Sequence, residues 1–186
     1  DHEDGDHDSH EHAHHGVDPH AWLDPANGAV WLVLIAEALA EADADNAATY
    51  RANAAAGARA LAALTEELDA ALADARAVPF IAFHDAYRYF TARFGLTMAG
   101  TVALSDAADP SPARLARLRG RVAELGVRCA FSEPQFDPKI LHVVAEGQAM
   151  NIAVLDPLGS RLEPGAALYA ELLRDMAARI AACSAP

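Results

Sequence analysis

The chain has 186 residues, 53% of them apolar, which is enough for one hydrophobic core of ordinary size. Its formal net charge is −13, with 27 acidic residues against 14 basic ones, and this balance argues against nucleic acid as a partner and favours cations. The most apolar run, AVWLVLIAEALA, is interrupted by Glu37 and is too short to cross a bilayer, so we expect no membrane insertion.

The first 18 residues form a tract of histidines and acidic residues. They include seven acidic residues and no Lys or Arg, which leaves −6 for the rest of the chain. The histidines of the tract are His2, His7, His10, His12, His14 and His15. Because the tract has almost no large apolar side chains, burial cannot offset the cost of ordering it, and we expect residues 1–18 to be disordered.

Residues 19–77 are expected to be helical. Asp24-Pro25 is typical of an N-cap followed by the first helical residue, and the helix is expected to run to about Ala42. Its apolar face consists of Val30, Trp31, Leu34, Ile35, Ala38 and Leu39. From Asp45 to about Arg76 the composition predicts one helix of about 30 residues, or about 45 Å. Its leucines do not sustain the heptads of a coiled coil, so we favour a helix that links two lobes.

Residues 78–186 alternate short apolar runs with amphipathic stretches. The apolar runs, 78–83, 96–104, 127–131 and 151–155, predict strands, and the stretches that follow them, 85–94, 111–125, 137–149 and 165–182, predict helices. Four successive β-α units imply a four-stranded parallel sheet flanked by helices, joined by right-handed crossovers. The expected fold class is therefore α/β.

Polar residues follow each predicted strand. They are His84 after the first, Ser105 and Asp106 after the second, Glu133 after the third and Asp156 after the fourth. Ligands of parallel sheets bind just beyond the carboxyl ends of the strands, so this edge is the expected site. Imidazole and carboxylate are ligands for zinc or manganese.

Each of these residues also has an ordinary structural interpretation. A histidine after a strand is often a loop residue, Asp156-Pro157 is typical of a turn, and Glu133 can pair locally. If His84 binds a metal, its second ring nitrogen needs an acceptor, and Asp85 and Asp24 are candidates for such a supporting carboxylate.

Four motifs occur in order along the chain: DPHAWLDP, FHDAYRYF, FSEPQFDP and LDPLG, preceded by the His/Asp-rich tract. In sequence and order they resemble the zinc-uptake binding proteins of ABC transporters, the ZnuA type of the cluster A-I metal-binding family. The resemblance runs from the tract to the carboxyl end.

The resemblance implies a periplasmic binding protein, not an enzyme, that captures Zn²⁺ and delivers it to the permease of an ABC transporter. It makes His20 and His84 metal ligands, Asp156 a ligand or near neighbour, and the six tract histidines a weak metal-collecting loop. It also implies a disulfide between Cys129 and Cys183. Manganese-type relatives tend to have Glu in place of His84, which favours zinc. A manganese-specific or adhesin-type relative is the alternative, and a zinc hydrolase, for which no HExxH motif is present, is a more distant one.

Members of this family have two α/β lobes joined by a long helix, with the metal between the lobes. The chain resembles the part from the His-rich loop onward. We therefore expect three segments: a metal-collecting loop at 1–18, a helical segment with the inter-lobe helix at 19–77, and a carboxyl-terminal α/β metal-binding lobe at 78–186. The other lobe would supply a further histidine ligand, so the site on this chain is expected to be incomplete.

Overall fold

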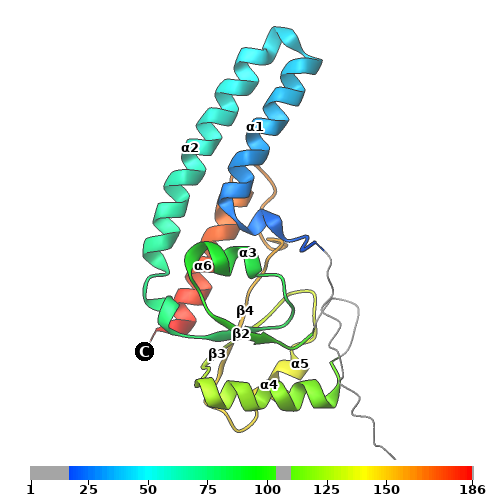
Figure 1. Cartoon of the computed structure of the whole chain (residues 1–186), viewed down its shortest axis with the longest axis vertical. Coiled ribbons are helices and arrows are strands. Elements are labelled where there is room, and N and C mark those ends of the chain that lie inside the picture. Colours follow the sequence, from blue (N-terminus) through cyan, green and yellow to red (C-terminus); the bar gives the residue numbers. More distant parts are fainter. Residues whose placement is uncertain (1–16, 104–109, 186) are drawn as a thin grey trace, which may run out of the picture.

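A computed structural model of the chain describes residues 17–103 and 110–185 (Figure 1). The six histidines of the tract, Ser105 and Asp106 lie outside the described residues. The helices are α1 (Pro25–Ala42), α2 (Ala47–Ala71), α3 (Arg88–Phe94), α4 (Pro112–Leu125), α5 (Lys139–Ala145) and α6 (Leu168–Ser184). The strands are β1 (Phe80–Ala82), β2 (Met98–Thr101), β3 (Cys129–Ser132) and β4 (Asn151–Val154). Three short 3-10 turns, η1 (Ala21–Leu23), η2 (Ala44–Asn46) and η3 (Asp74–Ala77), complete the described elements.

The four strands form one parallel sheet in the order β2-β1-β3-β4. Each predicted β-α unit is present in its expected place, so the predicted α/β fold is confirmed. The strands are shorter than the apolar runs that predicted them, because the ends of those runs continue into the turns that carry the polar residues. All four carboxyl ends therefore meet at one edge of the sheet.

Alternation along the strands divides the hydrophobic core into two layers. Phe80, Ala82 and Phe131 belong to the layer that contains residues of α2, α3 and α6. Ile81 and Ala130 belong to the opposite layer, with residues of α4 and α5. Successive side chains of a strand point to opposite faces, so a strand buried on both faces has a continuous apolar sequence. This explains why FIA and CAF lack polar residues.

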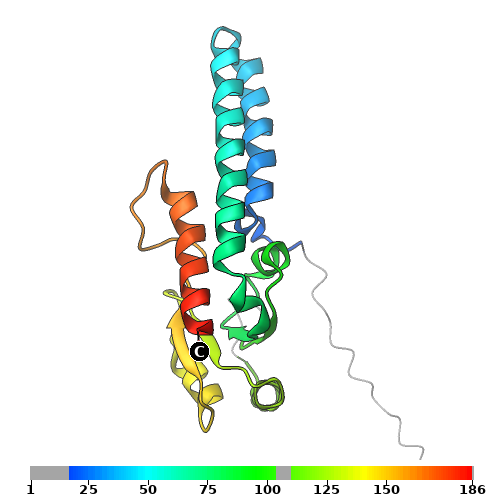
Figure 2. The same ribbon diagram turned by 90° about the vertical axis from the view of Figure 1, so that its left-hand side faces the viewer.

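Helices α1 and α2 form an antiparallel hairpin that projects from the sheet (Figures 1 and 2). Asp24 caps α1 as expected, because its Oδ1 accepts a hydrogen bond from the Ala26 N–H at 2.9 Å. Helix α2 ends at Ala71, earlier than the predicted Arg76, and the chain turns through η3 before β1. A Cβ at Gly57 would lie 2.7 Å from Leu32 Cδ1, so the missing side chain lets the two helices approach closely.

The predicted apolar face of α1 points outward. The exposed large hydrophobic residues of this helix are Val30, Trp31, Val33, Leu34, Ile35 and Leu39, and the helix instead buries Pro25, Ala36 and Ala40. By length and composition, α1 is apolar enough to cross a membrane, with 17% of it buried in this structure. This differs from the expectation that the most apolar run is too short to cross a bilayer. One such helix is weak evidence for a span, and in this structure the buried side of α1 packs along α2.

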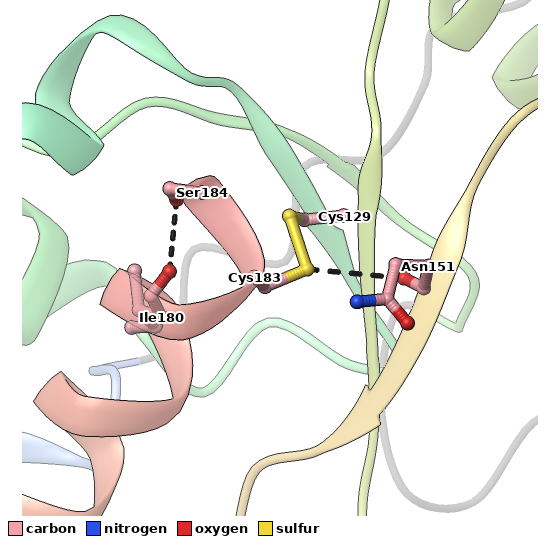
Figure 3. The surroundings of a disulfide bond; sticks show 5 residues. All are labelled: Cys129, Asn151, Ile180, Cys183 and Ser184. Atoms are coloured by element: carbon pink, nitrogen blue, oxygen red, sulfur yellow. Dashed lines mark hydrogen bonds between the residues drawn. A yellow bond between two sulfur atoms is a disulfide. The ribbon is translucent and has the colours of Figure 1, made fainter. Parts of the chain in front are cut away.

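A disulfide joins Cys129 on β3 to Cys183 near the end of α6, with a Cα–Cα distance of 5.9 Å (Figure 3). The pairing implied by the family resemblance is present in the structure. Cys129 is fully buried in the layer under α6, so the bond fastens the last helix to a central strand.

Removing this disulfide should destabilise the lobe. The two cysteines are 54 residues apart, and closing such a loop contributes roughly 4 kcal/mol in the chain-entropy model. Urea unfolding of the Cys129→Ala/Cys183→Ala variant should show a free energy of unfolding lower by about this amount. Two reactive thiols per chain in unreduced, denatured protein would contradict the pairing.

Candidate metal centre

Two histidines from distant parts of the chain meet at the carboxyl edge of the sheet. His84 follows β1, and His20 precedes the turn η1. Their Nε2 atoms lie 3.4 Å apart, and the two ring centroids are 5.2 Å apart at an interplanar angle of 62°. His84 is buried, whereas the His20 side chain retains 16% exposure. The pair therefore lies at the surface of the lobe with one open side.

Hydrogen bonds hold the His20 segment against the sheet. The Trp22 indole N–H donates to the Pro157 carbonyl at 2.9 Å, and the Tyr169 hydroxyl donates to the Trp22 carbonyl at 2.7 Å. Asp24 pairs with Arg93 of α3 through two contacts of 2.7 Å. These contacts connect η1 to the turn after β4, to α6 and to α3.

The other ring nitrogen of each histidine contacts a carboxylate. His20 Nδ1 lies 2.8 Å from Asp18 Oδ1, and His84 Nδ1 lies 2.6 Å from Glu133 Oε1. Glu133 is 3% exposed, so the second of these hydrogen bonds is shielded from water. An ionised carboxylate accepts only, so each Nδ1 must carry the proton. In the neutral form of both rings, the two Nε2 atoms that face each other then each carry a lone pair.

At 3.4 Å, two such nitrogens are close enough to share a proton or a metal ion between them. Nitrogen ligands at about 2.05 Å from a tetrahedral zinc are separated by about 3.3 Å. The observed Nε2–Nε2 distance therefore matches the spacing that a shared zinc ion requires. Histidines whose Nδ1 is held by carboxylate or carbonyl are also the usual form of zinc-binding imidazoles.

Asp156, the third predicted ligand, lies in the same region with its carboxylate engaged locally. Its Oδ2 accepts from the Ser160 hydroxyl at 2.7 Å and its Oδ1 from the Leu158 N–H at 3.1 Å. Among residues 17–103 and 110–185, no group of three or more His, Cys, Asp or Glu side chains is arranged to hold a metal ion. The structure thus brings together His20 and His84, and the role of Asp156 as a ligand stays a prediction.

The buried phenol of Tyr87 lies close to two of the carboxylates, those of Glu133 and Asp156. Burial raises the pKa of this phenol well above the usual value. The charge of Glu133, a hydrogen bond with Glu133 and the charge of Asp156 raise this pKa further. The phenol thus stays protonated and lies within electrostatic reach of both carboxylates.

The supporting carboxylates differ from those expected. Asp24 was a candidate for supporting a histidine, but its oxygens cap α1 and pair with Arg93. Asp85 also lies next to His84 in sequence, yet its Oδ1 is buried without a hydrogen-bond partner among the described residues. Asp18, which lies inside the segment expected to be disordered, supports His20 instead. The signal for this was present in the Asp-Pro-His order at the start of DPHAWLDP.

The buried negative charge around the pair favours a cation. Asp18 Oδ2 and Asp85 Oδ1 are both buried side-chain oxygens without a hydrogen-bond partner in the described part of the chain. Glu133 and Asp156 add two further buried carboxylates. A site with several acidic groups around two neutral imidazoles attracts a divalent cation.

Comparison with known proteins agrees with this geometry. Residues 1–183 match the family described as ZnuA, zinc-uptake complex component A, periplasmic. The chain is 53% identical over 169 residues to the high-affinity zinc uptake system protein ZnuA of Paracoccus denitrificans, covering 90% of this chain and 52% of that protein. The protein of the same name from Brucella abortus is 44% identical over 166 residues, covering 89% and 50%.

Solved structures show the same fold. A crystal structure of ZnuA superposes with a TM-score of 0.79 at 31% identity, covering 90% of this chain and 62% of that one. A mutant of the laminin-binding adhesin Lmb from Streptococcus agalactiae gives a TM-score of 0.81 at 30% identity, covering 90% and 63%. The chain spans about half the length of the curated relatives it matches.

The parallel sheet and the helical hairpin give the chain the fold of these solved structures, with the histidine pair at the sheet edge. With a family match that covers nearly all of its residues, the chain belongs to the ZnuA family.

Substituting either histidine of the pair should remove the zinc site. The His20→Ala and His84→Ala variants each keep one of the two imidazoles, and one imidazole binds zinc more weakly than two. We therefore expect calorimetric titration of either variant to lose the tightest zinc-binding event. His142→Ala is the matched control, because His142 is exposed on α5. Unchanged tight binding in both variants would show that the tightest site lies elsewhere.

Asp18→Asn should weaken zinc binding without removing it. The amide can still accept a hydrogen bond from Nδ1, but it lacks the charge that raises the basicity of the imidazole. Loss of such a supporting partner typically lowers metal affinity about 10- to 100-fold. Competition against a chromophoric chelator measures this, with Asp45→Asn, on the exposed turn η2, as the control. Equal affinities for the two variants would exclude the supporting role of Asp18.

Proposed function

We propose that the chain is the carboxyl-terminal lobe of a periplasmic binding protein that captures zinc and delivers it to the permease of an ABC transporter. The observation that carries the proposal is the pair of Nε2 atoms 3.4 Å apart, each on a ring whose Nδ1 contacts a carboxylate. The names of the relatives, high-affinity zinc uptake system proteins, support zinc as the cargo.

The two imidazoles favour zinc over manganese as the cargo. Neutral imidazole suits zinc, whereas oxygen ligands suit the harder manganese ion. A manganese-specific or adhesin-type protein is the alternative, and a laminin-binding adhesin is among the structural neighbours. Zinc outcompetes manganese at most nitrogen and oxygen sites, so growth of a strain that lacks the whole protein separates the two: rescue by added zinc supports the proposal, and rescue by manganese alone would favour the alternative.

A second lobe completes the proposed site. His20, His84 and Asp156 would supply three ligands, and a tetrahedral zinc needs a fourth. Relatives are about twice as long as the matched region, so they contain enough further chain for such a lobe. The exposed apolar face of α1 is a surface that a packed lobe would bury. Coordination by both lobes would hold the metal between them.

A zinc hydrolase would use the same metal differently. It would need a zinc position kept open for a water molecule, which zinc converts into a nucleophile. In the proposal the second lobe occupies that position, so the bound zinc is cargo and not a catalyst. Ester hydrolysis by the zinc-loaded whole protein, dependent on His84, would favour the hydrolase.

In the cell, the histidine pair should be required for growth when zinc is scarce. Replacing His20 or His84 by Ala in the whole protein should prevent growth in chelator-treated medium, and added zinc should restore it. The His142→Ala protein is expected to support normal growth, since this exposed side chain lies on α5. Normal growth of both site variants under zinc limitation would refute the proposal.

A further inference from the structure

Although the chain is acidic overall, one region of it is basic. Five of its 14 basic residues lie between positions 112 and 128, and Glu124 is the one acidic residue in that range. These basic residues are Arg114, Arg117, Arg119, Arg121 and Arg128. Four of the five belong to α4, a helix on the far side of the sheet from α6 (Figure 1). The composition gave no indication of such a region, because the chain's 27 acidic residues, all but Glu124 outside it, outweigh it.

A groove runs between this helix and the open edge of the sheet. Within the described part of the chain, strand β2 is the first strand of the sheet and pairs with β1 alone, so its other edge has no strand partner there. A space of about 680 Å³ lies between residues 99–101 of this strand and the α4 side chains Arg114, Arg117 and Arg121. We call it the α4 groove. Arg117 and Arg121 are exposed, whereas Arg114 donates to the Thr101 and Val102 carbonyls and is thereby held in place.

The chemistry of the α4 groove suits an extended acidic polypeptide. The unpaired edge of a strand offers backbone groups to a further extended segment. Arginine side chains beside it recognise carboxylates through paired N–H donors. An acidic segment would therefore find charge partners along α4, and along β2 it would find backbone groups other than the Thr101 and Val102 carbonyls, which accept from Arg114.

We propose that the α4 groove binds the chain's own acidic tract, residues 1–16. The tract contains six acidic residues and no Lys or Arg, which makes it complementary in charge to the groove. Sixteen residues in an extended conformation reach about 50 Å, which exceeds the span of a lobe with a radius of gyration of about 13 Å. Because the tract is covalently attached, its effective concentration at the groove is of millimolar order, so a weak contact is sufficient.

Zinc should release the docked tract. Each zinc ion bound by the tract histidines adds two positive charges, so three ions would cancel its six acidic charges. This consequence rests on the proposed zinc-binding function, because it requires the tract to collect zinc. The docking itself does not, since it is driven by opposite charge in the absence of metal.

Backbone amide chemical shifts of the full chain test the docking. In the presence of EDTA, the wild-type chain is compared with a variant whose six tract acids are changed to Asn or Gln, with the histidines retained. The amides of residues 99–101 and 112–125 should differ between the two. The difference should disappear in high salt, in Arg117→Gln/Arg121→Gln, and after EDTA is removed and at least four equivalents of zinc are added, one for the histidine pair and three for the tract. Arg59→Gln, on the exposed side of α2, should retain it as the control.

Three results would overturn the docking. Identical amide shifts in wild type and the neutral-tract variant would show that the tract does not contact the lobe. Differences around His20 and His84 would place the tract on the metal centre instead. Shifts that depend on protein concentration would assign the contact to a second chain. Zinc titration of His84 in the same samples separates this proposal from the function: a zinc response at His84, together with identical metal-free α4 shifts in wild type and the neutral-tract variant, refutes the docking alone.

Discussion

The candidate site depends on the attachment of residues 18–24 to the carboxyl edge of the sheet. His84 is placed by the sheet itself, since only the buried Phe83 separates it from the end of β1. His20 has no strand to place it, and it reaches His84 because Trp22 and Asp24 are bound to segments 135 and 69 residues away. Leu23 is fully buried between them and anchors the turn in the core. Without these contacts the lobe would keep one imidazole and lose the pair.

Carboxylates then determine what the pair can bind. Asp18 and Glu133 hold the outer nitrogens, so the inner nitrogens present lone pairs to the same point. Packing and the hydrogen bonds of the η1 segment hold this arrangement in place. A site that is already oriented loses little conformational entropy when the metal arrives. The open side of His20 leaves access for the ion and for further ligands.

Much of this could be predicted from the sequence, for physical reasons. Strands buried on both faces have apolar runs, and the residues after them must lie at one edge, so His84, Glu133 and Asp156 could be assigned to a site. His20 could not be assigned in this way, because its position depends on contacts with Pro157 and Tyr169 that no local pattern encodes. It was identified through the resemblance of DPHAWLDP to a known family. Asp18 was missed because it was assigned to the tract, although its carboxylate is part of the site.

Two surface features were also beyond the reach of local patterns. Helical periodicity identified the apolar face of α1 correctly, but it could not show that this face points away from α2. Net charge described the chain as acidic, and only the fold shows that Arg114, Arg117 and Arg121 line one groove at the sheet edge. In both cases the sequence specifies the element and the tertiary arrangement decides what it faces.

The central claim is that His20 and His84 share one zinc ion through their Nε2 atoms. Anomalous diffraction at the zinc absorption edge, from crystals of the chain with one equivalent of zinc, tests it most directly. The account predicts one dominant peak about 2.0–2.1 Å from both Nε2 atoms, with both Nδ1 atoms still on Asp18 and Glu133. A dominant peak elsewhere, or coordination through Nδ1 with either carboxylate contact broken, would contradict it.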